Sequence, residues 1–167
     1  ETASNLTAGT RLTAGAGGTW ALTGASGCTG QASDVQIRGG TVKAHGTSLA
    51  DTAKVNISSG DLTVASSETI ASLAGAGGTV TLGANTLTLA NANGGTYAGV
   101  IGGTGGLTLS GGTTETLSNT NTYTGLTTVS GGILDVTGSI GSTGQAIDVQ
   151  ISGGTLTAHG TSLAAPA

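Results

Sequence analysis

The residues of this chain with the clearest capacity for chemistry stand in a phrase, AHGTSL, that occurs twice. Each copy contains a histidine, a serine three positions later and an aspartate upstream, which are the residue types of a nucleophilic hydrolase. They are His45, Ser48 and Asp34 in the first copy and His159, Ser162 and Asp148 in the second. A triad depends on geometry that spacing does not set, and a histidine in a repeated corner is more often structural or solvated. We therefore expect no catalytic residue and no enzyme activity.

Other reactive or ligand-binding sites are also disfavoured. The two histidines are 114 positions apart, so in the stacked-coil fold predicted below they should lie several coils apart and not share a metal ion. The glycine run 102–106 is followed by Leu107, where a calcium-binding β-roll has an aspartate, and no Gly-Lys-Ser/Thr phosphate loop occurs. Cys28 is the only cysteine and its repeat counterpart is Ser142, which indicates a small loop residue. We expect no metal, no cofactor and no disulfide.

A polysaccharide hydrolase is a remote alternative. Such β-helical enzymes pair carboxylates on one face, whereas the acidic residues here are scattered and only Asp34, Asp51 and Asp61 share a region. Sugar binding would need exposed aromatic side chains. The chain offers Trp20, Tyr97 and Tyr123. Of these, Tyr123 lies in a motif described below and is expected to be a packing residue.

The composition indicates a folded all-β protein that does not bind nucleic acid. Glycine contributes 33 of 167 residues, charged residues 7% and aromatic residues 2%, which disfavours helices. The apolar 36% is arranged in short alternating runs, as in strands with one buried face. The net charge of −4 lacks the positive footprint that phosphates require. No apolar run approaches a membrane span of about 18 residues, and the start lacks signal-peptide features, so we expect a fragment of a longer protein.

A long internal repeat organises the chain. Residues 30–50 and 144–164 agree at 17 of 21 positions, and further matches at the same offset extend the duplication to 1–53 with 115–167. The substitutions keep the alternating pattern. We therefore interpret residues 1–167 as a single β-helical unit of a larger repetitive protein.

A shorter period of about 20 residues lies inside the long one. Val35-x-Ile37 returns as Val55-x-Ile57, and similar pairs recur further along, including Leu87-x-Leu89 with Leu107-x-Leu109. A β-sandwich or barrel would also contain strands every ten residues, but neither has a reason to recur at this spacing. The period predicts a parallel β-helix, or solenoid, of roughly eight stacked coils. Its corners are expected at the glycine pairs 39–40, 77–78, 102–103, 131–132 and 153–154.

Residues 99–136 resemble the autotransporter-associated β-strand repeat of bacterial type V secretion passengers. The family's pattern is G-x-G-x-L-T, then T-L-x-L-S, then N-T-Y-T-G-x-T-T-V, then G-x-L-x-V. The matching pieces are residues 105–108, 116–118, 121–129 and 132–136. A degraded copy near the start, RLTAGAGGTWALTG, lacks the Tyr-Thr-Gly step.

The resemblance implies a right-handed β-helix displayed on, or secreted from, the surface of a Gram-negative bacterium. Export would use an outer-membrane barrel in the parent protein. The implied function is a structural and adhesive passenger segment, contributing to virulence through a host surface receptor, extracellular matrix or self-association. The alternative is a spacer or secretion-assisting stalk whose activity resides elsewhere in the parent protein.

Overall fold

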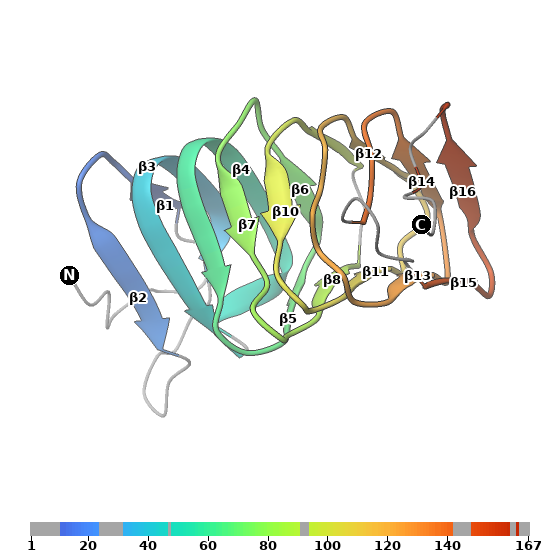
Figure 1. Cartoon of the computed structure of the whole chain (residues 1–167). Helices are drawn as coiled ribbons and strands as arrows, with labels where there is room; N and C mark the ends of the chain where they lie inside the picture. The colour runs from blue at the N-terminus through green and yellow to red at the C-terminus, as the bar shows by residue number, and fades with distance from the viewer. Residues whose placement is uncertain are drawn as a thin grey trace.

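The computed structural model describes residues 11–23, 32–46, 48–90, 94–141, 148–160 and 163. These residues form strands and corners without any helix, and parallel strands wind into a β-solenoid of about six turns (Figure 1). The all-β solenoid prediction is confirmed. The expected number of roughly eight coils comes from dividing the full length of 167 residues by the period of about 20. The described residues are fewer, and they form about six turns.

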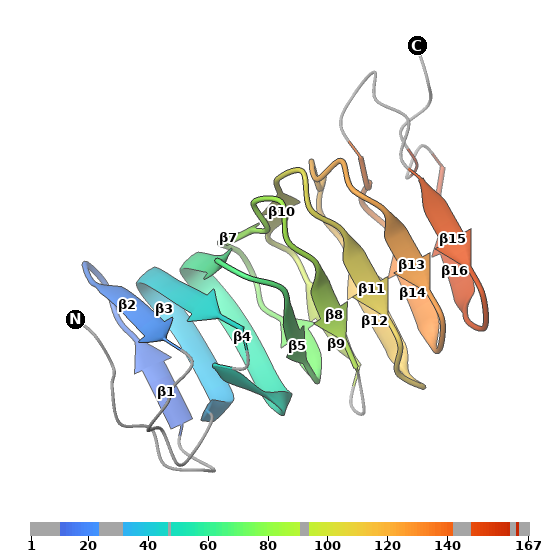
Figure 2. The same ribbon diagram turned by 90° about the horizontal axis from the view of Figure 1, so that it is seen from below.

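Three strand-lined faces surround the core, and each face stacks its strands along the solenoid axis (Figure 2). Face 1 contains β1 (Arg11–Ala14), residues 34–37 of β3 (Ala32–His45), residues 54–57 of β4 (Leu49–Val64), β6 (Ser72–Ala74), β9 (Gly95–Tyr97), β12 (Thr114–Leu117), β14 (Ile133–Val136) and β16 (Thr155–Ala158). Face 2 contains β2 (Thr19–Thr23), residues 41–45 of β3, residues 61–64 of β4, β7 (Thr79–Thr81) and β10 (Val100–Gly102). Face 3 contains β5 (Glu68–Ile70), β8 (Leu87–Leu89), β11 (Leu107–Leu109), β13 (Thr127–Val129) and β15 (Val149–Ile151).

Repeated apolar pairs stack directly on one another, as the short period predicts. Val35 pairs with Val55, Leu107 with Leu87, and Leu134 with Leu156. The paired positions differ by 17 residues, as for Ala32 and Leu49, to 23 residues, as for Leu12 and Val35. Corners of variable length absorb the difference, so the strands stay in register.

The core is filled by the inward side chains of alternating strands. Burial alternates along strands such as β8, β11 and β14, and the inward positions are mostly Leu, Ile and Val. Tyr123 is fully buried, which agrees with its expected packing role. Burying each Leu, Ile or Val side chain stabilises the fold by about 1.5 to 3 kcal/mol, so stacked coils close a core that one coil could not.

Glycines occupy the corner between faces 1 and 2, where successive backbones approach closely. Gly40, Gly60 and Gly78 have φ of 68°, 86° and 78°, which L side chains rarely adopt. A Cβ on Gly60 would also lie 2.5 Å from the carbonyl oxygen of Gly40. The glycine pair 153–154 has ordinary φ, and its backbone approaches that of the preceding coil closely instead.

The 114-residue repeat is out of phase with the coils. Val35 lies on face 1, whereas its counterpart Val149 lies on face 3. Val42 lies on face 2, whereas its counterpart Leu156 lies on face 1. The duplicated phrase therefore winds around the same axis one face away from its first copy.

The two copies also differ by one residue in register. In the first, Leu12 pairs with Val35, but in the second Val149 pairs with Thr127 and not with Leu126, the counterpart of Leu12. The counterpart of Val129 is Gly15, and glycine cannot fill a core position. A slip of one residue exchanges the inward and outward sets, which places Leu12 inside and leaves Leu126 45% exposed.

Candidate functional site

The first AHGTSL phrase forms a corner between β3 and β4. The hydroxyl of Ser48 accepts a hydrogen bond from the main-chain N–H of His45 at 3.1 Å and donates to Oε2 of Glu68 at 3.4 Å. Ser48 is buried, and the His45 side chain is exposed. The bond to Glu68 therefore links this corner to the next turn, and the bond from His45 involves only the main chain of the histidine.

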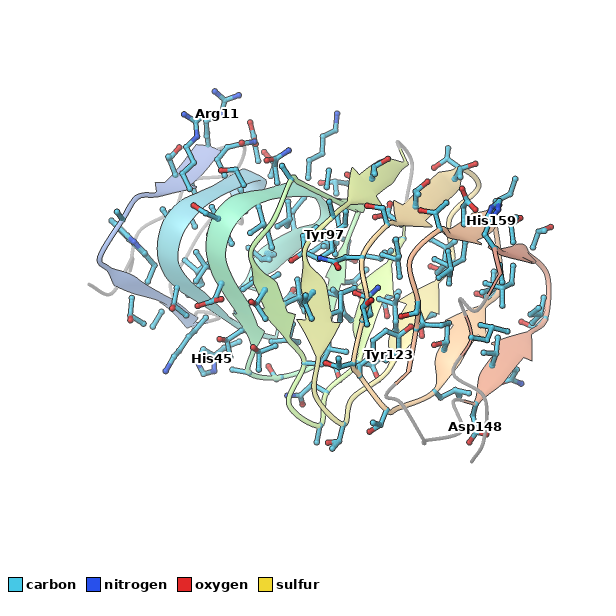
Figure 3. The ribbon with its side chains drawn as sticks, turned by 45° about the horizontal axis from the view of Figure 1, so that its top comes forward. Arg11, His45, Tyr97, Tyr123, Asp148 and His159 are labelled. Atoms are coloured by element: carbon cyan, nitrogen blue, oxygen red, sulfur yellow. The ribbon has the colours of Figure 1, made fainter. Side chains whose placement is uncertain are left out.

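The second phrase lies far along the solenoid, and its surroundings are different (Figure 3). Nε2 of His159 lies 2.9 Å from Oδ1 of Asp135 on the outer side of face 1, and both side chains contact solvent. Asp148 is exposed. Ser162, like Cys28 and Ser142, falls outside the described residues. The two histidines do not share one site, as their sequence separation predicts.

Asp34 is engaged in a surface ion pair. Nε2 of Gln36 donates to its Oδ1 at 2.8 Å, and Nε of Arg11 donates to its Oδ2 at 2.7 Å. These two hydrogen bonds hold the pKa of Asp34 below its ordinary value. A carboxyl group with a lowered pKa is a poor proton donor, so Asp34 does not suit the acid role of a glycoside hydrolase. Asp51 and Asp61 both lie on β4, the first exposed and the second half-buried.

Two buried carboxyl groups were missed by sequence analysis. Glu115 points inward from β12 between Gly95 and Leu134, and it is fully buried. Burial raises its pKa to about 8, and the nearby main chain of Leu73 offsets this only in part. A Cβ on Gly95 would lie 3.1 Å from Oε2 of Glu115, so the glycine leaves room for the carboxyl group. Glu115 is therefore mostly protonated at neutral pH.

Glu68 is the second inward carboxyl group, on β5. It is buried, and burial raises its pKa despite hydrogen bonds from Leu49 and Ser48. The signal for both glutamates is alternation, because Glu68 and Glu115 stand two positions before the inward residues Ile70 and Leu117. The long repeat is a second signal, because it has a glutamate at the position of Glu115 in both copies. The counterpart, Glu1, lies outside the described residues.

The aromatic side chains do not present a sugar-binding platform. Tyr97 and Tyr123 are fully buried, and burial raises the pKa of both phenols. The Tyr123 hydroxyl bonds to Oγ1 of Thr127 at 2.8 Å. Trp20 is half-buried and lines a hollow formed by residues 15–20, and a Cβ on Gly18 would lie 3.1 Å from its Nε1.

A buried asparagine organises face 2 beyond its last strand. Oδ1 of Asn121 accepts from the N–H of Ile101 at 2.9 Å, and its Nδ2 donates to the carbonyls of Asn119 and Ser139 at 3.0 Å. Asn119 in turn donates to the carbonyl of Ala98 at 2.8 Å. These amide side chains add to the main-chain hydrogen bonds between successive coils in this region, such as the bond from the N–H of Asn121 to the carbonyl of Ser139 at 2.8 Å.

The most regular outward surface is a line of hydroxyl groups on face 3, which we call the threonine row. It consists of Thr69, Thr88, Thr108 and Thr128, followed by Gln150. Parallel pairing places neighbouring members one strand apart, or about 4.8 Å. Each hydroxyl both donates and accepts hydrogen bonds, so the row could bind an extended polar partner but lacks an adjacent general base. It is the best candidate for a functional surface on the described residues.

Within the same residues, no group of three or more His, Cys, Asp or Glu is placed to hold a metal ion. The described part of the chain also has no helix of the length and apolarity needed to cross a membrane. Comparisons with protein-family models, curated proteins and solved structures find no match for this chain.

Proposed function

We propose that this chain is a structural and adhesive segment of a surface-displayed β-helical passenger, and that the threonine row is its contact surface. The single observation that carries the proposal is the row itself, which repeats one hydroxyl per turn over four consecutive strands. Such spacing suits a partner that is itself extended and polar, such as a matrix fibre or a cell-surface glycan.

The resemblance of residues 99–136 to autotransporter repeats supports a location on a Gram-negative cell surface. Its N-T-Y-T-G piece supplies Asn121 and Tyr123, which are both buried and both hydrogen-bonded to Ile101 in the preceding coil, Asn121 through its side chain and Tyr123 through its main-chain N–H. The motif therefore supports coil stacking. Stacking of successive coils is local, which suits a chain that folds progressively as it emerges from an export barrel.

The test is binding of the purified chain to cultured host cells and to immobilised matrix proteins. The variant carries Thr88→Val, Thr108→Val and Thr128→Val, which removes the hydroxyls but keeps β-branched side chains. The matched control carries Thr96→Val, Thr116→Val and Thr157→Val on the outer side of face 1. We expect the first variant to lose binding at least about tenfold, a change of about 1.4 kcal/mol, and the control to keep it.

A spacer or secretion-assisting stalk is the second candidate. It is favoured by the uninterrupted core, which runs through all the described turns and would form a rigid spacer without any binding function. A chain that binds neither cells nor matrix, while the parent protein does, would replace the adhesive proposal with the stalk.

A further inference from the structure

A short sequence on the outer side of face 1 has the form Asn-x-Ser. It consists of Asn56, Ile57 and Ser58 on β4. This is the acceptor pattern for N-linked sugars, in which the asparagine amide carries the sugar and a serine or threonine hydroxyl follows two positions later. Three residues recur often by chance, so the setting of the side chains decides whether the motif can react.

Alternation along β4 places both polar side chains of the motif outside the core. Ile57 is fully buried, whereas Asn56 is half-buried and Ser58 is exposed. The pairing with β3 shifts by one residue after Ile57, so Ser58 has no register partner there. Such a bulge leaves the extra residue outside the regular ladder and bends its strand. An enzyme that approaches face 1 therefore meets the amide and the hydroxyl on one surface.

The amide of Asn56 also differs from the amides of the other asparagines that the structure describes. Each of the other three donates from Nδ2 to a main-chain carbonyl, and they are Asn85, Asn119 and Asn121. The Asn56 side chain makes no hydrogen bond to any described residue, and its polar atoms contact solvent. Ala74, its register partner on β6, presents only a methyl group beside it. A substituent on Nδ2 would thus break no bond that holds the fold.

The hydroxyl of Ser58 is held only weakly. It donates to the carbonyl of Ile37 at 3.4 Å, which is long for a bond between two oxygen atoms. An enzyme could therefore engage this hydroxyl at little cost to the fold.

We propose that Asn56 is an acceptor site for an N-linked sugar, supplied as a hexose activated by a nucleotide diphosphate. Nδ2 would form a bond to C1 of the hexose, and the bond from C1 to the diphosphate oxygen would break. The diphosphate would leave with the electron pair, and one amide proton would pass to a base of the transferase. This inference is independent of the proposed function, since an adhesive segment and a stalk could each carry the sugar.

The test incubates the whole chain with a nucleotide-activated hexose and a glycosyltransferase specific for Asn-x-Ser/Thr, and peptide mass spectrometry locates the sugar. We expect one hexose on Asn56 and none on this peptide in Asn56→Gln. Ser58→Ala should lower the modification at least about tenfold, because a site that binds a hydroxyl discriminates strongly against its absence. Ser58→Thr should keep it. The matched control is Ser59→Ala, an exposed position directly after the motif, which should leave the modification unchanged.

Two results would overturn the proposal. One is an Asn56 that stays unmodified in the folded chain while a synthetic Asn-x-Thr peptide is modified in the same reaction. This includes the case in which hexose is found only on Asn5, whose Asn-Leu-Thr sequence lies outside the described residues. The other is equal modification of the wild-type chain and of Ser58→Ala, which would show that the sugar is attached without recognition of the motif.

Discussion

Glu115 is a carboxyl group held inside an apolar core, and its protonation is linked to folding. Its pKa is raised to about 8 in the fold, against a value near 4.5 in an unfolded chain. The folded state therefore binds the extra proton between these two values. Stability from this group is complete below about pH 4.5 and is lost as pH rises through about 8. Glu68, whose pKa is also raised, acts in the same direction.

We predict that the free energy of unfolding falls between pH 5 and pH 8, with a slope that approaches about 1.4 kcal/mol per pH unit from Glu115. Glu115→Gln should flatten this slope because the amide does not titrate. Urea unfolding of both chains at several pH values is the measurement. A slope as steep in Glu115→Gln as in the wild type, or stability that rises with pH in the wild type, would contradict the assignment.

Leu134 and Asp135 test the inward and outward assignment at neighbouring positions. Leu134 is fully buried and stacks on Leu156, whereas Asp135 points outward to His159. We expect Leu134→Asp to cost more than about 4 kcal/mol, because it buries an unpaired charge. Asp135→Asn should cost less than about 0.5 kcal/mol, as for an exposed ion pair. Chemical denaturation measures both, and a larger effect at Asp135 would show that the register is wrong by one residue.

Apolar alternation predicts which positions of a strand point inward and which point outward, but it predicts no glutamate in the core. The reason is physical, because a charged side chain normally lies outward, and only the space beside Gly95 admits a protonated carboxyl group at position 115. Alternation along the strand indicates that the side chain at position 115 points inward. Whether a carboxyl group fits there depends on the space left by the neighbouring coil, which alternation does not show.

At the scale of elements, corners decide whether successive strands can stack. Gly132 has φ of 67°, and a Cβ there would lie 2.5 Å from the carbonyl oxygen of Thr113. Gly112 lies on the preceding corner, and a Cβ there would have open space within 4 Å. We predict that Gly132→Ala costs about 1 to 3 kcal/mol and that Gly112→Ala changes stability by less than about 0.5 kcal/mol. Thermal unfolding of the two variants compares them, and equal melting temperatures would remove the corner argument.

The buried Asn121 side chain makes three hydrogen bonds to the main chain beyond the last strand of face 2, and its loss would remove all three. Asn121→Ala leaves the N–H of Ile101 and the carbonyl of Ser139 without their side-chain partner. We expect a cost of about 2 to 4 kcal/mol, since buried polar groups would lose their hydrogen bonds. Thr120→Ala, one position earlier and exposed, is the control and should be nearly neutral. Protection of the Ile101 amide from hydrogen exchange should fall only in Asn121→Ala.

The stacking of elements was predictable, but their distribution over faces was not. Apolar pairs such as Val35 with Val55 recur at the coil period, so their register follows from the sequence. The face on which a strand lies depends on how many residues each corner uses. That number varies from turn to turn, and it is set by local backbone conformations that apolar spacing does not encode.

For the whole molecule, stacked coils predict strand with almost no helix. Circular dichroism of the whole chain should therefore show a strand spectrum, and a helical spectrum would contradict the solenoid.

The offset between the two copies has a consequence for how the gene can change length. A crossover between the DNA segments that encode residues 30–50 and 144–164 would delete 114 residues in frame. The retained phrase would then wind directly after the first coil, on faces 1 and 2 instead of faces 3 and 1. Recombination would thus shorten the solenoid without any point mutation and would return the second phrase, with its outward side chains, to the faces that the first phrase occupies.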